Sequence, residues 1–298
     1  MRMRLPLLCA ALIGLAACGS GNSDGGTTPP PAASTAASAP AAPASAPAAT
    51  PAPASTANTA PAASGSSASA APAPAAAADP DDAKRPDVKP FVDEGKWVEG
   101  KQYFRIDPAQ PTSSPGKIEV TEVFSYGCPA CFQFHGVVDE LAKSLPKGAV
   151  MTYTPASFRP DENWPLLQRA YLTAQALGVD KQTHDAMFDA VFKSGELGIF
   201  DMKTQKPKPQ SAWPTIDDVA RFYAQHGVKA EDFVATANSF TINTKMKRAD
   251  ELIRAYEVDS TPTIVVNGKY RFTPGSAGGY PQAVELAQWL ISKEAAGK

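Results

Sequence analysis

Aromatic side chains are missing from the first ninety residues of this 298-residue chain, where Phe91 is the first to appear. From Gly19 to about Lys89 the sequence consists mainly of Ala, Pro, Ser and Thr. Such a segment cannot bury enough apolar surface to offset the entropy lost on ordering, so we predict that it is disordered. About 210 residues remain, which is enough for one folded domain with a single core, at residues 90–298.

The chain also lacks a long apolar run. Its first such stretch, residues 5–17, follows two arginines and is too short for a comfortable membrane span, which is typical of an export signal. The stretch ends in Leu15-Ala16-Ala17-Cys18, which resembles the lipobox of bacterial lipoproteins. The resemblance implies a signal at residues 1–17, lipid on Cys18, and a tether over residues 18–89 that anchors the protein without spanning the membrane. The alternative is an ordinary cleaved signal in which Cys18 is incidental.

Neither charge sign is in large excess, because 28 basic residues face 30 acidic ones and the formal net charge is −2. Basic side chains gather at Lys245, Lys247 and Arg248, but Asp250 and Glu251 follow at once. We interpret this cluster as the solvated face of a helix. The composition therefore indicates no nucleic-acid partner.

Cysteine is scarce, with four in the whole chain. Cys9 would leave with the signal and Cys18 would carry lipid, so the folded part keeps only Cys128 and Cys131. Exported domains can use structural disulfides freely, yet this one has a single candidate pair. Closing so short a loop removes little chain entropy and stabilises a fold little. The pair is therefore predicted to serve chemistry.

Hydrophobic periodicity predicts strands at both ends of the folded part and helices between them. The expected strands are residues 101–106, 117–124, 150–154, 263–266 and 269–272; the expected helices are 129–145, 165–177, 184–192, 216–226, a long one ending near Tyr256, and 280–293. Residues 200–214, with three prolines, are predicted to be an exposed loop. This order indicates an α/β domain with a helical subdomain inserted at about residues 160–250.

The motif Cys128-Pro129-Ala130-Cys131 stands where a predicted strand ends and a helix begins. Two cysteines at i and i+3 lie about one turn apart, within the roughly 4.4–6.8 Å between Cα atoms that a disulfide tolerates. Cys128 would also meet the unpaired N–H groups of the helix start, which favour its thiolate, the attacking species. We therefore expect Cys128 to be the exposed nucleophile, and Cys131 to be more buried and to act second.

Two plainer uses of the pair stay open. Zinc could bind both sulfurs together with His135, which follows Cys131 by four residues on the same helix face, but no second cysteine pair completes the usual four ligands. A purely structural disulfide is the other alternative. The sequence favours a redox dithiol that needs no metal and no cofactor.

The stretch from Glu122 to Phe134 resembles the active-site stretch of the DsbA family of thiol:disulfide interchange proteins. The likeness runs from about Gly95 to Glu294 and includes Thr261-Pro262-Thr263 and the residues from Val266 to Tyr270. It implies an α/β thioredoxin fold with an inserted helical subdomain, in agreement with the predicted order of elements. It also implies a protein that works as a monomer.

The resemblance assigns roles to three residues outside the dithiol. Pro262 matches the family's cis-proline beside the active-site pair, and Thr261 precedes it where the main chain of a substrate would pair; the alternative is a trans proline in a turn. Glu122 matches an acid of the family. Alternation along its strand directs this side chain to the apolar side, where a raised pKa would let it exchange protons with Cys131. The alternative is a half-buried glutamate at a strand end.

Some positions depart from the family pattern. The dipeptide Pro129-Ala130 stands where the best-known members have Pro-His, and loss of that histidine removes a donor near the attacking sulfur. We therefore expect a less depressed thiol pKa and a less oxidising disulfide. His135 replaces an acidic residue and is assigned no role. His184 and His226, in the helical block, are expected to face solvent.

The predicted function is that of a thiol:disulfide oxidoreductase that introduces disulfides into unfolded exported proteins with free thiols, in the periplasm. The resemblance implies a partner of the DsbB type, a quinone-linked membrane protein that restores the disulfide. One alternative is a disulfide isomerase or reductase that is kept reduced, which the threonine before Pro262 would suit. Another is a non-catalytic envelope chaperone that grips clients through the apolar surface around the cysteines.

Overall fold

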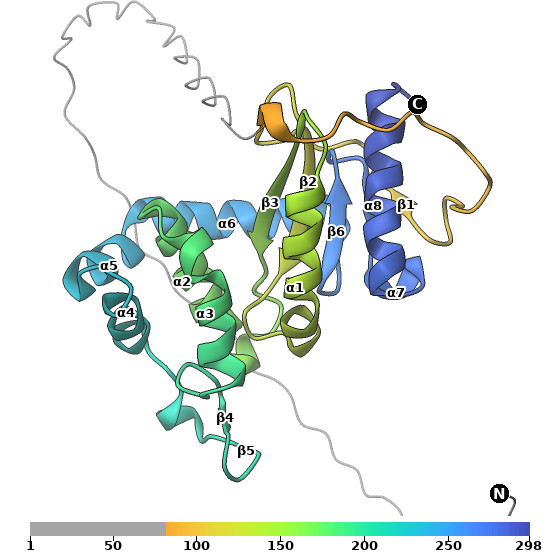
Figure 1. The fold of residues 1–298 in the computed structure, drawn as a ribbon. Coiled ribbons are helices and arrows are strands. Elements are labelled where there is room, and N and C mark those ends of the chain that lie inside the picture. The colour runs from red at the N-terminus through yellow and green to blue at the C-terminus, as the bar shows by residue number, and fades with distance from the viewer. Residues whose placement is uncertain (1–81) are drawn as a thin grey trace, which may run out of the picture. The chain divides into compact units, whose positions relative to one another are not determined.

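An inner strand of the sheet, β2, leads directly into the cysteine motif (Figure 1). In the computed structural model, which describes residues 82–298, five strands form a sheet in the order β1-β7-β6-β2-β3. β2 runs parallel to β3 and antiparallel to β6. The strands are β1 (Phe104–Arg105), β2 (Ile118–Phe124), β3 (Ala149–Pro155), β6 (Thr263–Val266) and β7 (Tyr270–Phe272). The predicted signal, Cys18 and most of the predicted tether lie outside the described residues.

Two helices pack together over one part of this sheet. α1 (Pro129–Ser144) follows the cysteine motif, and α8 (Tyr280–Ala295) lies beside it (Figure 1). Phe134 and Leu141 of α1 share a buried cluster with Leu286 of α8 and Ile264 of β6. The periodicity predicted both helices, but it missed the short α7 (Pro274–Ala277), which Thr273 caps by accepting a hydrogen bond from the Ser276 backbone.

A helical subdomain occupies the chain between β3 and β6. It contains α2 (Trp164–Ala176), α3 (Asp180–Phe192), α4 (Ile216–Ala224), α5 (Ala230–Ala237) and α6 (Phe240–Ala255). The predicted long helix ending near Tyr256 is present as α6, whereas α5 was not predicted. The chain breaks after Asn238, and the Ser239 hydroxyl caps α6 by accepting from the Ile242 N–H at 3.2 Å. Both α4 and α6 begin at a residue whose hydroxyl caps the helix, Thr215 and Ser239.

A small hairpin stands where an exposed loop was predicted. β4 (Phe200–Asp201) pairs with β5 (Lys206–Pro207), and most of the side chains between Phe200 and Pro209 are exposed as expected. The Asp201 carboxylate accepts hydrogen bonds from the backbone N–H groups of Lys203 and Thr204 and so closes the turn. The hairpin projects from the helical subdomain (Figure 1).

Aromatic rings join the sheet to the helical subdomain. The Phe124 ring, at the end of β2, lies 5.1 Å from the rings of Tyr126 and Tyr171 and 5.3 Å from that of His184. His184 is buried here, so the expectation that it faces solvent is wrong. The apolar surroundings of an imidazole do not show in local periodicity, because its neighbours come from other elements.

The first described residues are held at the end of α1 that is remote from the cysteines. The Asp82 carboxylate accepts from the Gly148 N–H at 3.2 Å, and the Pro86 carbonyl accepts from the Lys147 N–H at 2.8 Å. Further along, the Val92 carbonyl accepts from the Trp289 indole at 2.8 Å. The chain thus enters the fold on the side opposite the dithiol. None of the helices within residues 82–298 combines the length and the apolarity needed to cross a membrane.

Candidate active site

Cys128 is the N-cap residue of α1, as the sequence predicted from the strand-to-helix junction. Its backbone is extended, with φ −90° and ψ 115°, and Pro129 opens the helix. The Cys128 sulfur accepts a hydrogen bond from the Cys131 N–H at 3.3 Å. A sulfur at this position meets the positive end of the helix and one of its unpaired N–H groups, which both favour the thiolate.

Both cysteines are thiols in the structure, and both are buried. Cys131 is fully covered, whereas 5% of Cys128 is exposed, so the predicted order of exposure is right but Cys128 is not an exposed residue. The cause is non-local, because Thr261 and Trp164 line the same cavity as Cys128. The Cys128 sulfur is reached through this cavity, whose volume is about 790 Å³.

The two sulfurs differ strongly in acidity. Hydrogen bonds, first that of the Cys131 thiol and then those of the Thr261 side chain and of the Cys131 and Ala130 backbone, lower the pKa of Cys128 to about 6 against the opposing effect of burial. Burial raises the pKa of the Cys131 thiol well above its ordinary value, and the Cys128 sulfur and the Glu122 charge add to this effect. At neutral pH the pair therefore holds one thiolate, on Cys128, and one thiol.

Glu122 belongs to β2, which has a neighbouring strand on each side. It pairs with Tyr153 of β3 and with Ile264 of β6. The side chain is 1% exposed, and its Oε1 atom has no hydrogen-bond partner. Burial raises the pKa of this carboxyl well above its ordinary value, and the Cys128 charge adds to the shift. The sequence predicted this burial from alternation, but all of β2 except its first residue is buried, so alternation does not single out Glu122.

Thr261 and Pro262, the two residues just before β6, lie beside the dithiol. The Thr261–Pro262 peptide is cis, and Pro262 is buried. The Cys128 thiol donates a 3.5 Å hydrogen bond to the Thr261 carbonyl. The sequence-based expectation that these two residues adjoin the active-site pair is therefore matched by their positions, although they are more than 130 residues away along the chain.

Sequence reasoning missed the wall of the site that the helical subdomain provides. We name the cavity beside Cys128 the hairpin cavity, because β4 and its turn form one side of it; its lining includes Phe158, Trp164, Leu167, Leu197, Phe200 and Met202. Gly127 is in close contact with this wall, since a Cβ atom at that position would lie 2.7 Å from the Trp164 indole nitrogen. Glycine is thus required next to the nucleophile for reasons of space.

The comparisons with known proteins agree with this geometry. A family model described as thioredoxin matches residues 114–285. DsbA of Pseudomonas aeruginosa, a thiol:disulfide interchange protein, is 38% identical over 200 residues, which cover 67% of this chain and 87% of the relative. The corresponding protein of Azotobacter vinelandii is 36% identical over 195 residues, which cover 65% of this chain and 83% of the relative. The chain belongs to the DsbA family.

Solved structures of DsbA proteins share the fold. The crystal structure of Pseudomonas aeruginosa DsbA aligns with a TM-score of 0.59 at 37% identity and covers 68% of this chain and 97% of that one. The DsbA of Xylella fastidiosa aligns with a TM-score of 0.59 at 32% identity and covers 67% of this chain and 98% of that one. The predicted thioredoxin fold with a helical insertion is confirmed. This DsbA-family protein is a thiol:disulfide oxidoreductase with the redox pair Cys128–Cys131.

His135 and His184 have different surroundings in this DsbA-family protein. His135 stacks on Phe132 and lies 3.9 Å from the Asp185 carboxylate. No three His, Cys, Asp or Glu side chains gather as a metal site within residues 82–298. Burial lowers the pKa of His184 to about 4, so its ring is neutral at pH 7, and its Nδ1 shares a 3.0 Å hydrogen bond with the Tyr126 hydroxyl. This bond ties the strand-to-helix turn to the helical subdomain.

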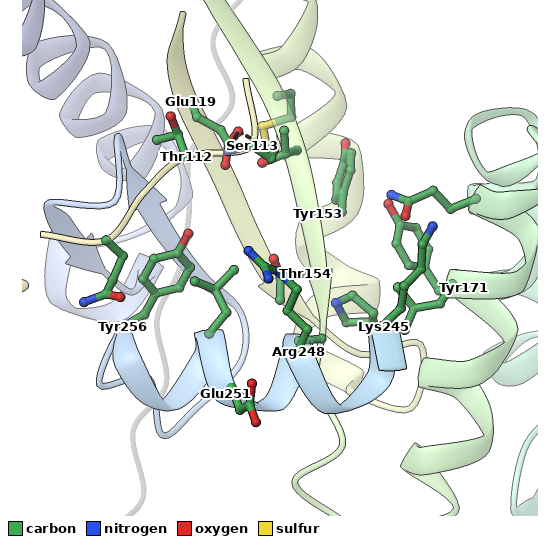
Figure 2. Close-up of a pocket in the computed structure, with 18 of the residues that line it drawn as sticks. Thr112, Ser113, Glu119, Tyr153, Thr154, Tyr171, Lys245, Arg248, Glu251 and Tyr256 are labelled. Carbon is green, nitrogen blue, oxygen red and sulfur yellow. Dashed lines mark hydrogen bonds between the residues drawn. The ribbon is translucent and has the colours of Figure 1, made fainter. Parts of the chain in front are cut away.

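A second cavity of the DsbA-family domain, about 730 Å³ in volume, lies between α6, β3 and the loop before β2. Figure 2 shows Arg248 extending from α6 toward Thr154 and Lys245 beside Tyr171, with Glu119 and Ser113 at the opposite end. The interpretation of the basic cluster as a solvated helix face is right for Lys247 and Arg248, which are exposed, whereas Lys245 is half-buried. Neither cysteine lines this cavity, so it is separate from the redox site.

Proposed function

We propose that this DsbA-family protein acts as an oxidase, which passes the Cys128–Cys131 disulfide to client proteins with free thiols. The observation that supports the proposal is the acidity of Cys128, with its pKa of about 6, beside a buried Cys131. A thiolate that is stable in the reduced protein is a good leaving group, and its stability favours reduction of the protein and oxidation of the client.

The exchange proceeds in two balanced steps. A client thiolate attacks the Cys128 sulfur of the oxidised pair, the Cys128–Cys131 bond breaks, and Cys131 leaves with the electron pair and takes up a proton. A second client thiolate then attacks the client sulfur of this mixed disulfide, and Cys128 leaves as a thiolate. The client loses two electrons and gains a disulfide, and the protein is left as the dithiol.

Other residues assist these steps in our proposal. Glu122, whose pKa burial raises well above its ordinary value, gives a proton to Cys131 when that sulfur leaves and takes it back when the disulfide forms again. Thr261 and Pro262 bind the main chain of the client beside the sulfur. Pro129 and Ala130 tune the pair, because Ala130 supplies only a backbone N–H to the Cys128 sulfur and no side-chain donor.

The thiol acidity can be converted into a contribution to the reduction potential. At pH 7 a shift of the Cys128 pKa from 9.0 to about 6 stabilises the dithiol by about 1.4 kcal/mol. For a two-electron couple this corresponds to about 30 mV. The shift raises the potential, because it stabilises the reduced form.

Equilibration of the purified protein with glutathione buffers between pH 5 and 8 tests the oxidase proposal. We expect a potential well above that of thioredoxin, about −270 mV at pH 7. Reduction binds two protons below the Cys128 pKa and one above it, so the potential falls by about 59 mV per pH unit below pH 6 and by about 30 mV per unit above it. A potential near or below that of thioredoxin contradicts the oxidase and favours the reductase alternative.

We further propose that the protein works in the periplasm, held to an envelope membrane by lipid on Cys18, and that a DsbB-type quinone-linked membrane protein reoxidises it. The short apolar run and the lipobox-like residues before Cys18 support the anchor. Incorporation of labelled palmitate in bacterial cells, compared with that of the Cys18→Ser variant, tests it; equal labelling of the two proteins contradicts the anchor.

A further inference from the structure

The hairpin cavity offers apolar surface next to the reacting sulfur. Phe158 and Phe200 are among the few large apolar side chains exposed within residues 82–298, at 36% and 46%, and both line this cavity. Between them the inner surface is formed by buried side chains that include Trp164, Leu167 and Leu197. Exposed aromatic rings around an apolar hollow are typical of a surface that binds a partner.

This surface is continuous with the reaction centre. Cys128, Pro129 and Thr261 line the same cavity as Phe200. A client that forms a mixed disulfide with Cys128 must enter through the opening that exposes the sulfur, so part of the client lies against the hairpin cavity during each turnover. The walls come from distant parts of the chain, because Thr261 precedes β6 whereas Phe200 and Met202 belong to β4 and its turn.

Arg159, which lines the cavity, is already paired with two carboxylates. The Arg159 guanidinium lies 3.1 Å from the Asp161 carboxylate and 2.7 Å from that of Glu162. Asp259, which also lines the cavity, accepts a hydrogen bond from the Ser260 hydroxyl at 3.1 Å. Arg159 therefore offers no unpaired charge to a charged side chain of the client, and the apolar inner surface favours an apolar one.

We propose that the hairpin cavity binds a large apolar side chain of the client, preferably an aromatic one, two positions from the reacting cysteine. In an extended client the side chains at i and i+2 point to the same side, about 6.8 Å apart. A cysteine directed at Cys128 therefore directs its second neighbour to the same face of the protein. Phe158 and Phe200 are specificity-determining residues in this proposal, which rests on the proposed oxidase function.

Two peptides test the proposal on the full-length oxidised protein. Both carry the same two cysteines, and they differ only in a Phe or a Ser two positions from one of them. Quenched-flow oxidation, followed by mass spectrometry of the alkylated peptides, gives their second-order rate constants. We expect the Phe peptide to react about tenfold faster, which corresponds to about 1.4 kcal/mol. The Phe200→Ser variant should reduce this preference to less than threefold.

Three further variants make the test selective. Phe158→Ser removes the other exposed aromatic ring of the cavity and should also reduce the preference, which guards against the possibility that Phe200→Ser only unfolds the hairpin. Phe200→Leu keeps apolar surface and should retain at least half of the preference. Phe240→Ser removes a ring that is 84% exposed at the start of α6, outside the cavity, and should keep the full tenfold ratio.

The outcomes separate this inference from the function on which it rests. If the protein oxidises neither peptide, the oxidase proposal fails. If it oxidises both at equal rates, or if the preference survives in Phe200→Ser and Phe158→Ser alike, disulfide donation stands and the specificity proposal is overturned.

Discussion

The Cys128→Ser and Cys131→Ser variants should both lose disulfide donation, by about a thousandfold or more, because neither can hold the internal disulfide. They should differ in what they trap. Cys131→Ser keeps the acidic Cys128 thiolate and lacks the second thiol, so mixed disulfides with clients should accumulate. Cys128→Ser keeps only Cys131, which is fully buried and has a raised pKa, so it should trap none.

Non-reducing gels and mass spectrometry of both variants, mixed with a disulfide-containing model client, measure the trapped species. Thermal unfolding of the variants and of the reduced parent protein provides the control for folding. If Cys128→Ser continues to support client maturation at the parental rate, the protein is a chaperone that binds clients without redox chemistry. If it traps clients as readily as Cys131→Ser, the assignment of the attacking sulfur is wrong.

Glu122→Leu should make the protein more stable and at the same time slower. The buried carboxyl has an Oε1 atom without a hydrogen-bond partner, so an apolar replacement of similar size removes an unmet desolvation cost of about 1–3 kcal/mol. Loss of the proton exchange with Cys131 should slow client oxidation by about a hundredfold. Chemical unfolding gives the first quantity, and stopped-flow oxidation of a dithiol peptide gives the second.

Glu119→Leu is the matched control, since Glu119 is a second buried glutamate of β2. Its carboxylate accepts hydrogen bonds from the Ser113 N–H and hydroxyl at 3.0 and 2.6 Å and from the Thr121 hydroxyl at 3.2 Å. Its replacement should lower the free energy of unfolding by about 1–3 kcal/mol and leave client oxidation unchanged. Parallel behaviour of the two variants would show that Glu122 has only a structural role.

Local signals were enough to predict much of this fold. Apolar residues at strand and helix spacing located β2, β3, β6 and α1, and the Pro129 start of α1 followed from its sequence. The helix ending near Tyr256 was predicted, but α5 was missed, because Asn238 and Ser239 separate it from α6 only by capping, without a proline or glycine. A residue such as Asn or Ser can cap a helix or lie within one, so it indicates a helix boundary only weakly until its hydrogen-bond partners are known.

The site was predictable to the extent that it is local. The dithiol and its acidity follow from two cysteines at a helix start, whereas the walls around them come from distant segments. Trp164 packs on Gly127 across 37 positions of sequence, and the bond between Tyr126 and His184 spans 58. Nothing in the residues near His184 distinguishes a buried imidazole from an exposed one, because its burial depends on rings supplied by β2 and α2.

Asp82 and Pro86 are attached near Lys147 and Gly148. The position of this attachment also determines which face of the domain is accessible when the protein is immobilised on a surface. α1 has 16 residues and so extends about 24 Å between that attachment and Cys128. A protein immobilised on a sensor chip through the Asp82 end therefore directs its dithiol toward the flowing solution. A linker at the opposite end of α1 would press the same sulfur against the chip.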